Sequence, residues 1–164
     1  MTALTYPDAL IRRVLDETKT IAMVGASANW VRPSNFAMKY LQQKGFRVIP
    51  VNPSSAGKAI HGEMCYASLG DIPDSYEMVD IFRRSEDAGA IVDEAISLKD
   101  IKGISTVWLQ LDVIDAEAAA RAEAAGLTAI MDRCPKIEYG RLNHELAWAG
   151  INTGVISSKR PRLR

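Results

Sequence analysis

The chain has 164 residues, and its 20 lysines and arginines balance 20 aspartates and glutamates, so the formal net charge is zero. A length of about 150 residues is typical of one domain. Hydrophobic residues make up 48% and charged residues 24%, an ordinary globular composition that excludes wholesale disorder. A neutral chain is also a poor candidate for coating nucleic acid through bulk charge, so we expect no nucleic-acid partner.

We expect one domain over residues 1–150, followed by a tail over residues 151–164 that has four basic residues and no acid. This tail is typical of a flexible, solvated terminus. No stretch approaches the roughly 20 apolar residues of a membrane helix, and the N-terminus lacks the apolar region of a secretory signal. The sequence therefore predicts a cytoplasmic protein without a membrane partner.

Cysteine and histidine are scarce. The two cysteines, Cys65 and Cys134, and the two histidines, His61 and His144, do not have the spacing of a zinc site. A structural disulfide is not expected in a chain without a secretory signal. We therefore expect neither a metal nor a disulfide.

Short apolar runs alternate with helical patterns along the chain. The first run, 20–24, is partly β-branched and ends at Gly25, which is typical of a buried strand followed by a turn. Pro33 is typical of the first position of a helix, and Gly45 is placed to end that helix. In chain order the pattern predicts a helix over 4–18, a strand over 20–24, a helix from Pro33 to Gly45, a strand over 46–51, an irregular segment over 54–75, a strand over 78–82, a helix from Ser85, a strand over 106–110, a helix over 116–125, a strand over 127–131 and a helix over 138–149.

Strands separated by helices indicate βαβ units, which build a parallel sheet. Right-handed crossovers then place helices on both faces of the sheet. We therefore expect an α/β fold, a Rossmann-like open parallel sheet of about five strands in the order 3-2-1-4-5. Ligands of such sheets bind beyond the carboxyl ends of the strands. The candidate site is therefore formed by the segments 25–30, 52–53, 83–85, 110–112 and 132–135.

The turn after the first strand has part of a dinucleotide-binding pattern. Gly25 matches its first glycine, but Ser27 and Trp30 replace the second and third, so a complete G-x-G-x-x-G is absent. A turn of small residues that enters a helix can still receive phosphate on backbone N–H groups. Side chains that would add donors or positive charge are Ser27, Asn29, Arg32 and Ser34. The alternative is a tight turn capped by Ser34 that binds no ligand.

The end of the second strand has no carboxylate. NAD-binding sheets place an Asp or Glu there to bind the ribose diol, whereas this chain has Val51, Asn52 and Pro53. The absence counts against NAD. NADP would need only a basic group nearby and stays open as an alternative.

Five ordered segments, 21–27, 48–53, 79–83, 107–110 and 131–135, resemble the CoA-binding domain family. Its members are stand-alone relatives of the N-terminal domain of the succinyl-CoA synthetase alpha subunit. The resemblance covers about residues 15–142, and it implies a Rossmann-like domain that holds coenzyme A across the carboxyl edge of its sheet.

By this similarity, three loops would contact the cofactor. The first turn would lie against the diphosphate or ribose, and the second and third loops would line the site; the residues concerned are Gly25, Ala26, Ser27, Asn52, Pro53, Phe82 and Arg83. CoA has a 3′-phosphate and no free ribose diol, so a CoA site needs no diol-binding acid, and arginine suits its phosphates.

The charge balance makes local cations important for an anionic ligand. Residues 1–156 contain 16 basic and 20 acidic residues, so this body of the chain is mildly acidic. The arginines nearest to strand ends are Arg32, Arg83 and Arg133. Arg133 also precedes Cys134, where it would favour a thiolate; the alternative for Cys134 is a small residue packed under Pro135.

The resemblance does not extend to catalysis. The synthetase needs a second domain with a phosphorylated histidine, and neither His61 nor His144 lies in a glycine-rich loop. The sequence offers no nucleophile–base pair, so we expect no catalytic residue and a protein that binds CoA or acyl-CoA as a carrier, sensor or regulatory protein. A small NADP-dependent oxidoreductase or an acyl-CoA-handling enzyme remains the alternative. A homodimer or a partner protein also stays open, with Trp148 as a candidate contact.

Overall fold

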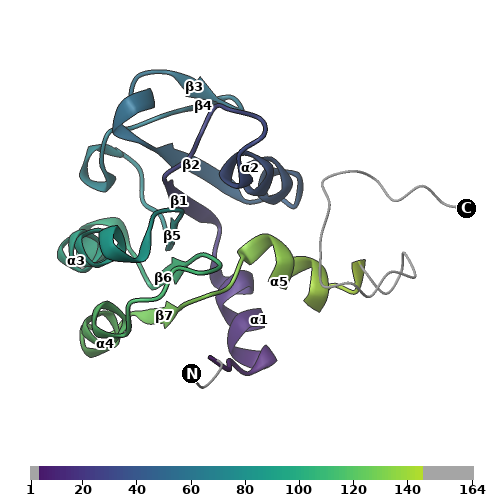
Figure 1. Cartoon of the computed structure of the whole chain (residues 1–164), viewed down its shortest axis with the longest axis vertical. Coiled ribbons are helices and arrows are strands. Elements are labelled where there is room, and N and C mark those ends of the chain that lie inside the picture. Colours follow the sequence, from purple (N-terminus) through teal and green to yellow (C-terminus); the bar gives the residue numbers. More distant parts are fainter. Residues whose placement is uncertain (1–3, 146–164) are drawn as a thin grey trace, which may run out of the picture.

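The computed structural model of the protein describes residues 4–145. Its centre is one sheet of five parallel strands, in the spatial order β2-β1-β5-β6-β7 (Figure 1). The strands are β1 (Thr20–Val24), β2 (Arg47–Val51), β5 (Met78–Ile81), β6 (Thr106–Leu109) and β7 (Thr128–Ile130). All four neighbouring pairs are parallel. The predicted α/β, Rossmann-like parallel sheet is therefore confirmed.

The predicted strand order is wrong in one respect. The third predicted strand, β5, pairs with β1 and not with β2, so the order is 2-1-3-4-5 in the numbering of the five predicted strands. The reason lies in the segment after β2, which covers the outer edge of that strand. Tyr66 N–H donates to Pro50 O at 3.0 Å, and Asn52 N–H donates to Tyr66 O at 2.9 Å. With this edge of β2 occupied, the other edge of β1 receives β5.

The covering segment contains no long helix. It consists of two short 3-10 turns, η1 (Pro53–Ser55) and η2 (Leu69–Asp71), and a small antiparallel pair, β3 (Ala59–Ile60) and β4 (Glu63–Met64). This agrees with the irregular segment predicted over 54–75. Pro50 has no N–H to donate, and β2 is an edge strand, which is where proline is tolerated in a sheet.

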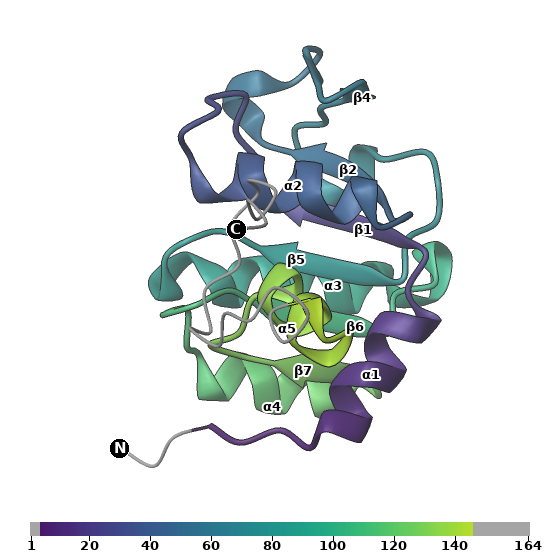
Figure 2. The same cartoon turned by 90° about the vertical axis from the view of Figure 1, so that its right-hand side faces the viewer.

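Within residues 4–145, five helices cover the two faces of the sheet, as predicted. They are α1 (Asp8–Glu17), α2 (Pro33–Gln43), α3 (Ser85–Lys102), α4 (Ala116–Ala124) and α5 (Pro135–Leu142). Figure 1 shows α3 and α4 on one face, and Figure 2 shows α1, α2 and α5 in front of the other. Residues of β1 alternate accordingly: Ala22 and Val24 belong to the core under α3 and α4, whereas Ile21 and Met23 belong to the core under α1, α2 and α5.

The last helix differs from its predicted bounds. It begins at Pro135, three residues before the predicted start at 138, because proline fixes φ and suits the first helical turn. It also ends earlier than predicted, at Leu142, with Asn143 as its C-cap and a turn at residues 143–144. The predicted end at 149, Trp148 and the basic tail over 151–164 lie outside the described residues. Within residues 4–145, no helix is long and apolar enough to cross a membrane, and no cluster of three His, Cys, Asp or Glu side chains is placed to hold a metal.

Candidate ligand site at the switch point of the sheet

From β1 the chain continues to β2 on one side of β1, and the later strands, beginning with β5, are added on its other side. The point at which the strand order reverses, the switch point of the sheet, therefore lies between β1 and β5. At this point Gly25 adopts a φ of +86°, which L side chains rarely adopt. Its N–H donates to Val51 O at 2.8 Å. A Cβ on Gly25 would stand 2.1 Å from the backbone oxygen of Phe82. Glycine is therefore required here because the first turn lies against the loop that follows β5.

Two asparagine side chains hold the first turn in place. Asn52 donates from Nδ2 to Ala26 O at 2.8 Å, and Asn35 donates from Nδ2 to Ser27 O at 2.8 Å. Asn35 is buried in α2, and its Oδ1 lies 2.9 Å from His61 Nε2. Because both carbonyl groups are fixed by side chains from neighbouring segments, the turn is built before any ligand arrives.

Asn29 acts within the same turn. Its backbone N–H donates to Ser27 Oγ at 3.1 Å, and its Oδ1 accepts from Val31 N–H at 3.2 Å. The turn then leads into α2, whose N-cap residue, Arg32, makes no side-chain capping hydrogen bond. In the first turn of α2, Pro33 has no N–H, and Asn35 and Phe36 donate their N–H groups to Arg32 O at 3.0 and 3.4 Å. The backbone N–H of Ser34 is therefore the one in this turn that is available for an anion.

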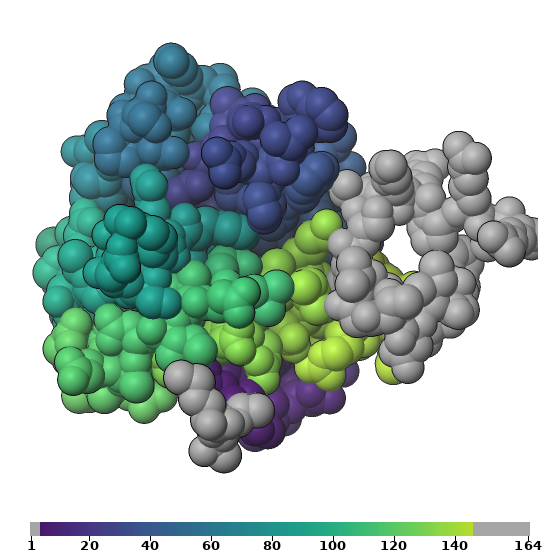
Figure 3. Space-filling model, in the orientation of Figure 1, coloured from purple at the N-terminus to yellow at the C-terminus, as the bar shows by residue number. Residues whose placement is uncertain are grey.

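The loops after β5, β6 and β7 are linked to one another. Asp132 accepts at Oδ1 from the N–H of Asp112 at 2.8 Å. Ser85 Oγ donates to Asp112 O at 3.2 Å and accepts from Ile114 N–H at 3.0 Å. These contacts draw the three strand ends together, and Figure 3 shows teal, green and yellow-green parts of the chain meeting on one face.

A cavity of about 920 Å³ lies at this carboxyl edge of the sheet, within the size range of small-molecule sites. Seven of the predicted site residues line it: Gly25, Ser27, Arg32, Ser34, Asn52, Phe82 and Arg83. They come from three loops far apart in the sequence, and the topology brings them together as the fold predicted.

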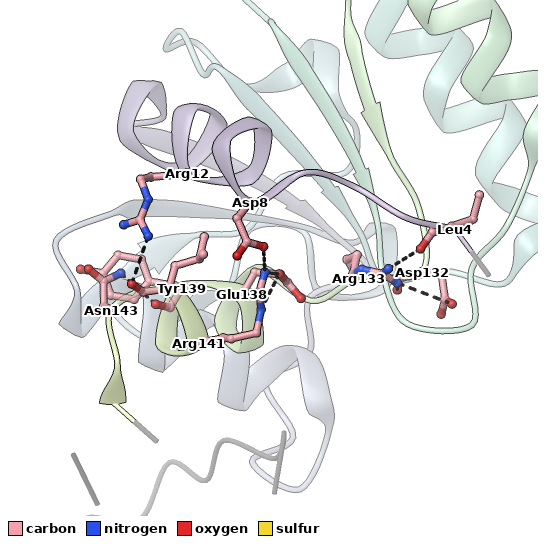
Figure 4. A network of polar contacts seen from close by, with 10 residues as sticks. Leu4, Asp8, Arg12, Asp132, Arg133, Glu138, Tyr139, Arg141 and Asn143 are labelled. Carbon is pink, nitrogen blue, oxygen red and sulfur yellow. Dashed lines mark hydrogen bonds and ion pairs between the residues drawn. The ribbon is translucent and has the colours of Figure 1, made fainter. Parts of the chain in front are cut away.

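Four predicted site residues do not line the cavity. Ala26 is buried and Asn29 serves the turn itself, while Pro53 begins η1. Arg133 points elsewhere, as Figure 4 shows: its guanidinium donates to Leu4 O and to its neighbour's backbone oxygen, Asp132 O, the latter at 2.7 Å. It also lies 5.5 Å from the centre of the Tyr6 ring. Arg133, the cation among these four predicted residues, is therefore bound by the N-terminal segment and does not reach the cavity.

Eleven further residues line the cavity. Five of them lie in segments that the sequence predicts at the carboxyl edge, although they were not among the named site residues: Arg84, Gln110, Leu111, Asp112 and Cys134. The other six lie outside those segments and were missed: Pro33, Phe36, Ala37, Val113, Lys136 and Ile137. Nothing in the local sequence indicates that the first turn of α5 also reaches the cavity, because that contact depends on how α5 packs against α2.

The lining is cationic although the chain is neutral. Within the described part of the chain, four cations line the cavity, Arg32, Arg83, Arg84 and Lys136, against one carboxylate, Asp112. Arg84 is already paired with Glu86 at 2.7 Å and Asp87 at 3.0 Å. Arg83 donates from Nη2 to Asn52 Oδ1 at 3.4 Å, a weak contact that leaves most of its donors available.

A buried polar pair lies next to the cavity. Gln110, which lines it, donates from Nε2 to Asp80 Oδ1 at 2.7 Å, while Asp80 Oδ2 has no partner among the described residues. Burial raises the pKa of Asp80 to about 7. Burial also raises the pKa of the Cys134 thiol to about 11, with the Asp80 charge adding to the effect. Cys134 is therefore a protonated thiol at neutral pH, and Arg133 does not activate it.

The sequence matches the CoA binding domain family over residues 19–140, so the chain belongs to this family. It is similar to the uncharacterized protein YneT of Bacillus subtilis (strain 168), with 32% identity over 131 residues that are 80% of this chain and 93% of that protein.

Two solved structures are also similar. One is Prb, the PH1109 protein redesigned for binding, with a TM-score of 0.78 and 40% identity over 85% of this chain and 94% of that chain. The other is a hypothetical protein from Pyrococcus horikoshii OT3, with a TM-score of 0.77 and 37% identity over 87% of this chain and 99% of that one.

Proposed function

We propose that this protein binds coenzyme A or an acyl-CoA in the cavity at the switch point and acts in the cytoplasm as a non-catalytic carrier, sensor or regulatory protein. The observation that supports it best is the cavity lining, with four cations against one carboxylate on a neutral chain. CoA carries its negative charge on phosphates, and a cationic pocket next to an uncapped helix N-terminus suits phosphate. Family membership supports the same class of ligand.

In this proposal the residues divide into those that touch the ligand and those that hold the turn. Gly25, Ser27 and Ser34 face the diphosphate, and Arg32 and Arg83 supply the charge. The role of Ala26, Asn29, Asn52 and Pro53 is to shape the first two loops, because their polar groups are used within the protein. Arg133 has no part in the proposed site, since its guanidinium is held by the N-terminal segment.

The alternatives find less support at the site. β2 ends at Val51 and is followed by Asn52, whose amide is engaged with Ala26 O and Ser54, so this position offers no acid for the ribose diol of NAD. A nucleophilic acyl-transfer role would require a thiolate at Cys134, and burial keeps that thiol protonated. A receiving partner protein or a second copy of the chain, which a carrier or regulator would need, stays a prediction.

The test is thermal unfolding with CoA, dephospho-CoA, NAD and NADP, each added separately. A ligand at a hundred times its dissociation constant stabilises the folded state by about 2.7 kcal/mol. We expect CoA to raise Tm clearly and NAD to leave it unchanged. A shift with NADP and none with CoA would overturn the proposal.

Arg83 can be tested within the same assay. Arg83→Ala should weaken the binding of CoA more than that of dephospho-CoA if Arg83 holds the 3′-phosphate. Arg121→Ala is a matched control, because Arg121 pairs with Asp93 on the α3–α4 side of the sheet and does not line the cavity. Equal losses for both ligands would exclude the 3′-phosphate role.

A further inference from the structure

Lys136 is a buried cation that faces the cavity. Only 8% of the residue is exposed, yet it lines the cavity together with Cys134 and Ile137. It lies in the first turn of α5, where a positive charge is unfavourable because the helix dipole is positive at that end. Burial lowers its pKa, which means that the surroundings disfavour the charged form.

No carboxylate compensates this charge among residues 4–145. Glu138, on the same helix, pairs with Arg141 at 2.6 Å. Glu145 accepts from Tyr40 Oη at 2.6 Å and pairs with Lys44. Buried lysines are normally paired, so this unpaired ammonium is an exception that requires a cause.

Two aromatic rings of α2 form the walls around the ammonium group. The Nζ of Lys136 lies 5.9 Å from the centre of the Phe36 ring and 5.6 Å from that of the Tyr40 ring. Such contacts stabilise a cation by less than a buried charge loses with its hydration. The rings therefore orient the ammonium without neutralising it.

We propose that Lys136 is the centre of an anion-binding subsite, walled by Phe36 and Tyr40, that receives an anionic oxygen group of the bound CoA ligand. This inference rests on the proposed function and adds a residue that the first-turn pattern does not indicate. The anionic group is either a phosphate of CoA itself or a carboxylate at the end of its acyl group, and both offer the charged oxygen that an enclosed ammonium accepts.

The surroundings of Lys136 differ from those of the exposed cations that line the same cavity. The side chain of Arg84 is 74% exposed and already paired, and Arg32 is also exposed, whereas Lys136 is enclosed between α2 and α5. An ion pair in a water-poor pocket is screened less than one at the surface. Lys136 should therefore contribute more to the binding free energy of an anionic ligand than Arg32 or Arg84 does.

The decisive experiment compares the wild type with Lys136→Met, using calorimetric titration with CoA, dephospho-CoA, butyryl-CoA and succinyl-CoA. We expect a loss of affinity of about tenfold or more for every ligand that places its anionic group at Lys136, the size of one lost charge-assisted hydrogen bond. A loss for CoA but not dephospho-CoA assigns the 3′-phosphate, and a loss for succinyl-CoA alone assigns an acyl carboxylate. An equal loss for all four assigns the diphosphate.

Lys44→Met is the matched control, because Lys44 lies 5.3 Å from the centre of the same Tyr40 ring but pairs with Glu145 and does not line the cavity. It should leave every affinity unchanged. The ligand-free Lys136→Met protein should have an unchanged or raised Tm, since an uncompensated buried charge is removed.

Three results would overturn the subsite: affinities of Lys136→Met within about twofold of the wild type for all four ligands, a comparable loss in Lys44→Met, or a lowered Tm of the ligand-free Lys136→Met protein. If the wild type itself binds none of the four ligands, the proposed function fails as well. If it binds CoA and Lys136→Met binds equally well, only the subsite fails.

Discussion

At Gly25 two independent constraints exclude any side chain. The φ of +86° disfavours L residues, and the added Cβ would meet the Phe82 carbonyl oxygen at 2.1 Å. Backbone cannot move aside as a flexible side chain can, so either β1 or the loop after β5 would have to shift. The same close approach keeps the first turn beside Arg83 in the proposed CoA site.

We expect Gly25→Ala to lower the free energy of unfolding by several kcal/mol, or to prevent folding, as measured by urea denaturation. Gly45→Ala provides the control, because Gly45 has a φ of +97° but nothing within 4 Å of the added Cβ. The free energy of unfolding of Gly45→Ala should fall only by the cost of a left-handed backbone conformation at an L residue, about 1 kcal/mol. Similar losses in both variants would show that the contact with Phe82 contributes nothing.

Asp80, at the centre of the sheet, should make the stability of the folded protein depend on pH. Burial raises its pKa to about 7 in the folded protein, whereas an Asp in an unfolded chain titrates at about pH 4. Between these values the folded state binds the proton more tightly, so the Asp80 contribution to stability is complete below about pH 4 and is lost as the pH rises towards about 7.

Asp80→Asn should remove this contribution. Relative to the wild type, the variant should become more stable as the pH rises from about 5 to about 8, by a few kcal/mol at most, since one pKa unit corresponds to about 1.4 kcal/mol. Chemical denaturation at a series of pH values measures the difference. Parallel stability profiles for the two proteins would mean that Asp80 is ionised in the folded state throughout.

At the scale of elements, the sequence pattern predicted most of the fold. The five strands of the main sheet and the five helices of residues 4–145 follow from local apolar periodicity, but two helices begin away from their predicted positions. The first, α1, begins at Asp8 and not at residue 4, because its N-cap residue Pro7 is extended, and α5 begins at Pro135 and not at residue 138. The strand order was not predictable in the same way. It depends on Tyr66, in the irregular segment, pairing with Pro50 and Asn52 at the end of β2, a contact that no periodicity indicates.

The residues of the candidate site also divide into those that local sequence predicts and those that only tertiary packing determines. Residues directly after strands, such as Gly25, Asn52 and Arg83, were predictable because the carboxyl ends of parallel strands meet at one edge. Lys136 reaches the cavity through the packing of α5 on α2, and Arg133 is drawn away by the N-terminal segment. Both outcomes depend on tertiary contacts between segments about a hundred residues apart.

Over the whole molecule, the first and last described helices are joined by charge. Arg141 of α5 donates to Asp8 of α1 at 2.8 Å and to Glu138 at 2.6 Å, and Arg12 donates to Leu142 O at 3.4 Å (Figure 4). The Glu138 side chain is only 9% exposed. Removal of Arg141 would therefore leave a nearly buried carboxylate without its partner.

Arg141→Gln should lower the free energy of unfolding by about 1–3 kcal/mol in urea denaturation, since an unpaired buried charge is costly. Arg121→Gln is the matched control: the Arg121 side chain is 45% exposed, close to the 42% of Arg141, but its partner Asp93 is 54% exposed. We expect less than about 1 kcal/mol there. Equal effects would mean that the burial of Glu138 does not matter.

The covering of β2 by the segment around Tyr66 also bears on how this protein behaves at high concentration. An exposed edge strand is a template onto which a second sheet can add, and Tyr66 occupies that position on β2. At the opposite edge, Tyr6 Oη accepts from the N–H of Met131 just after β7, and Leu4 is held by Arg133. The protein's own chain therefore contacts the carboxyl end of each edge strand, which leaves less unpaired backbone there for edge-to-edge aggregation.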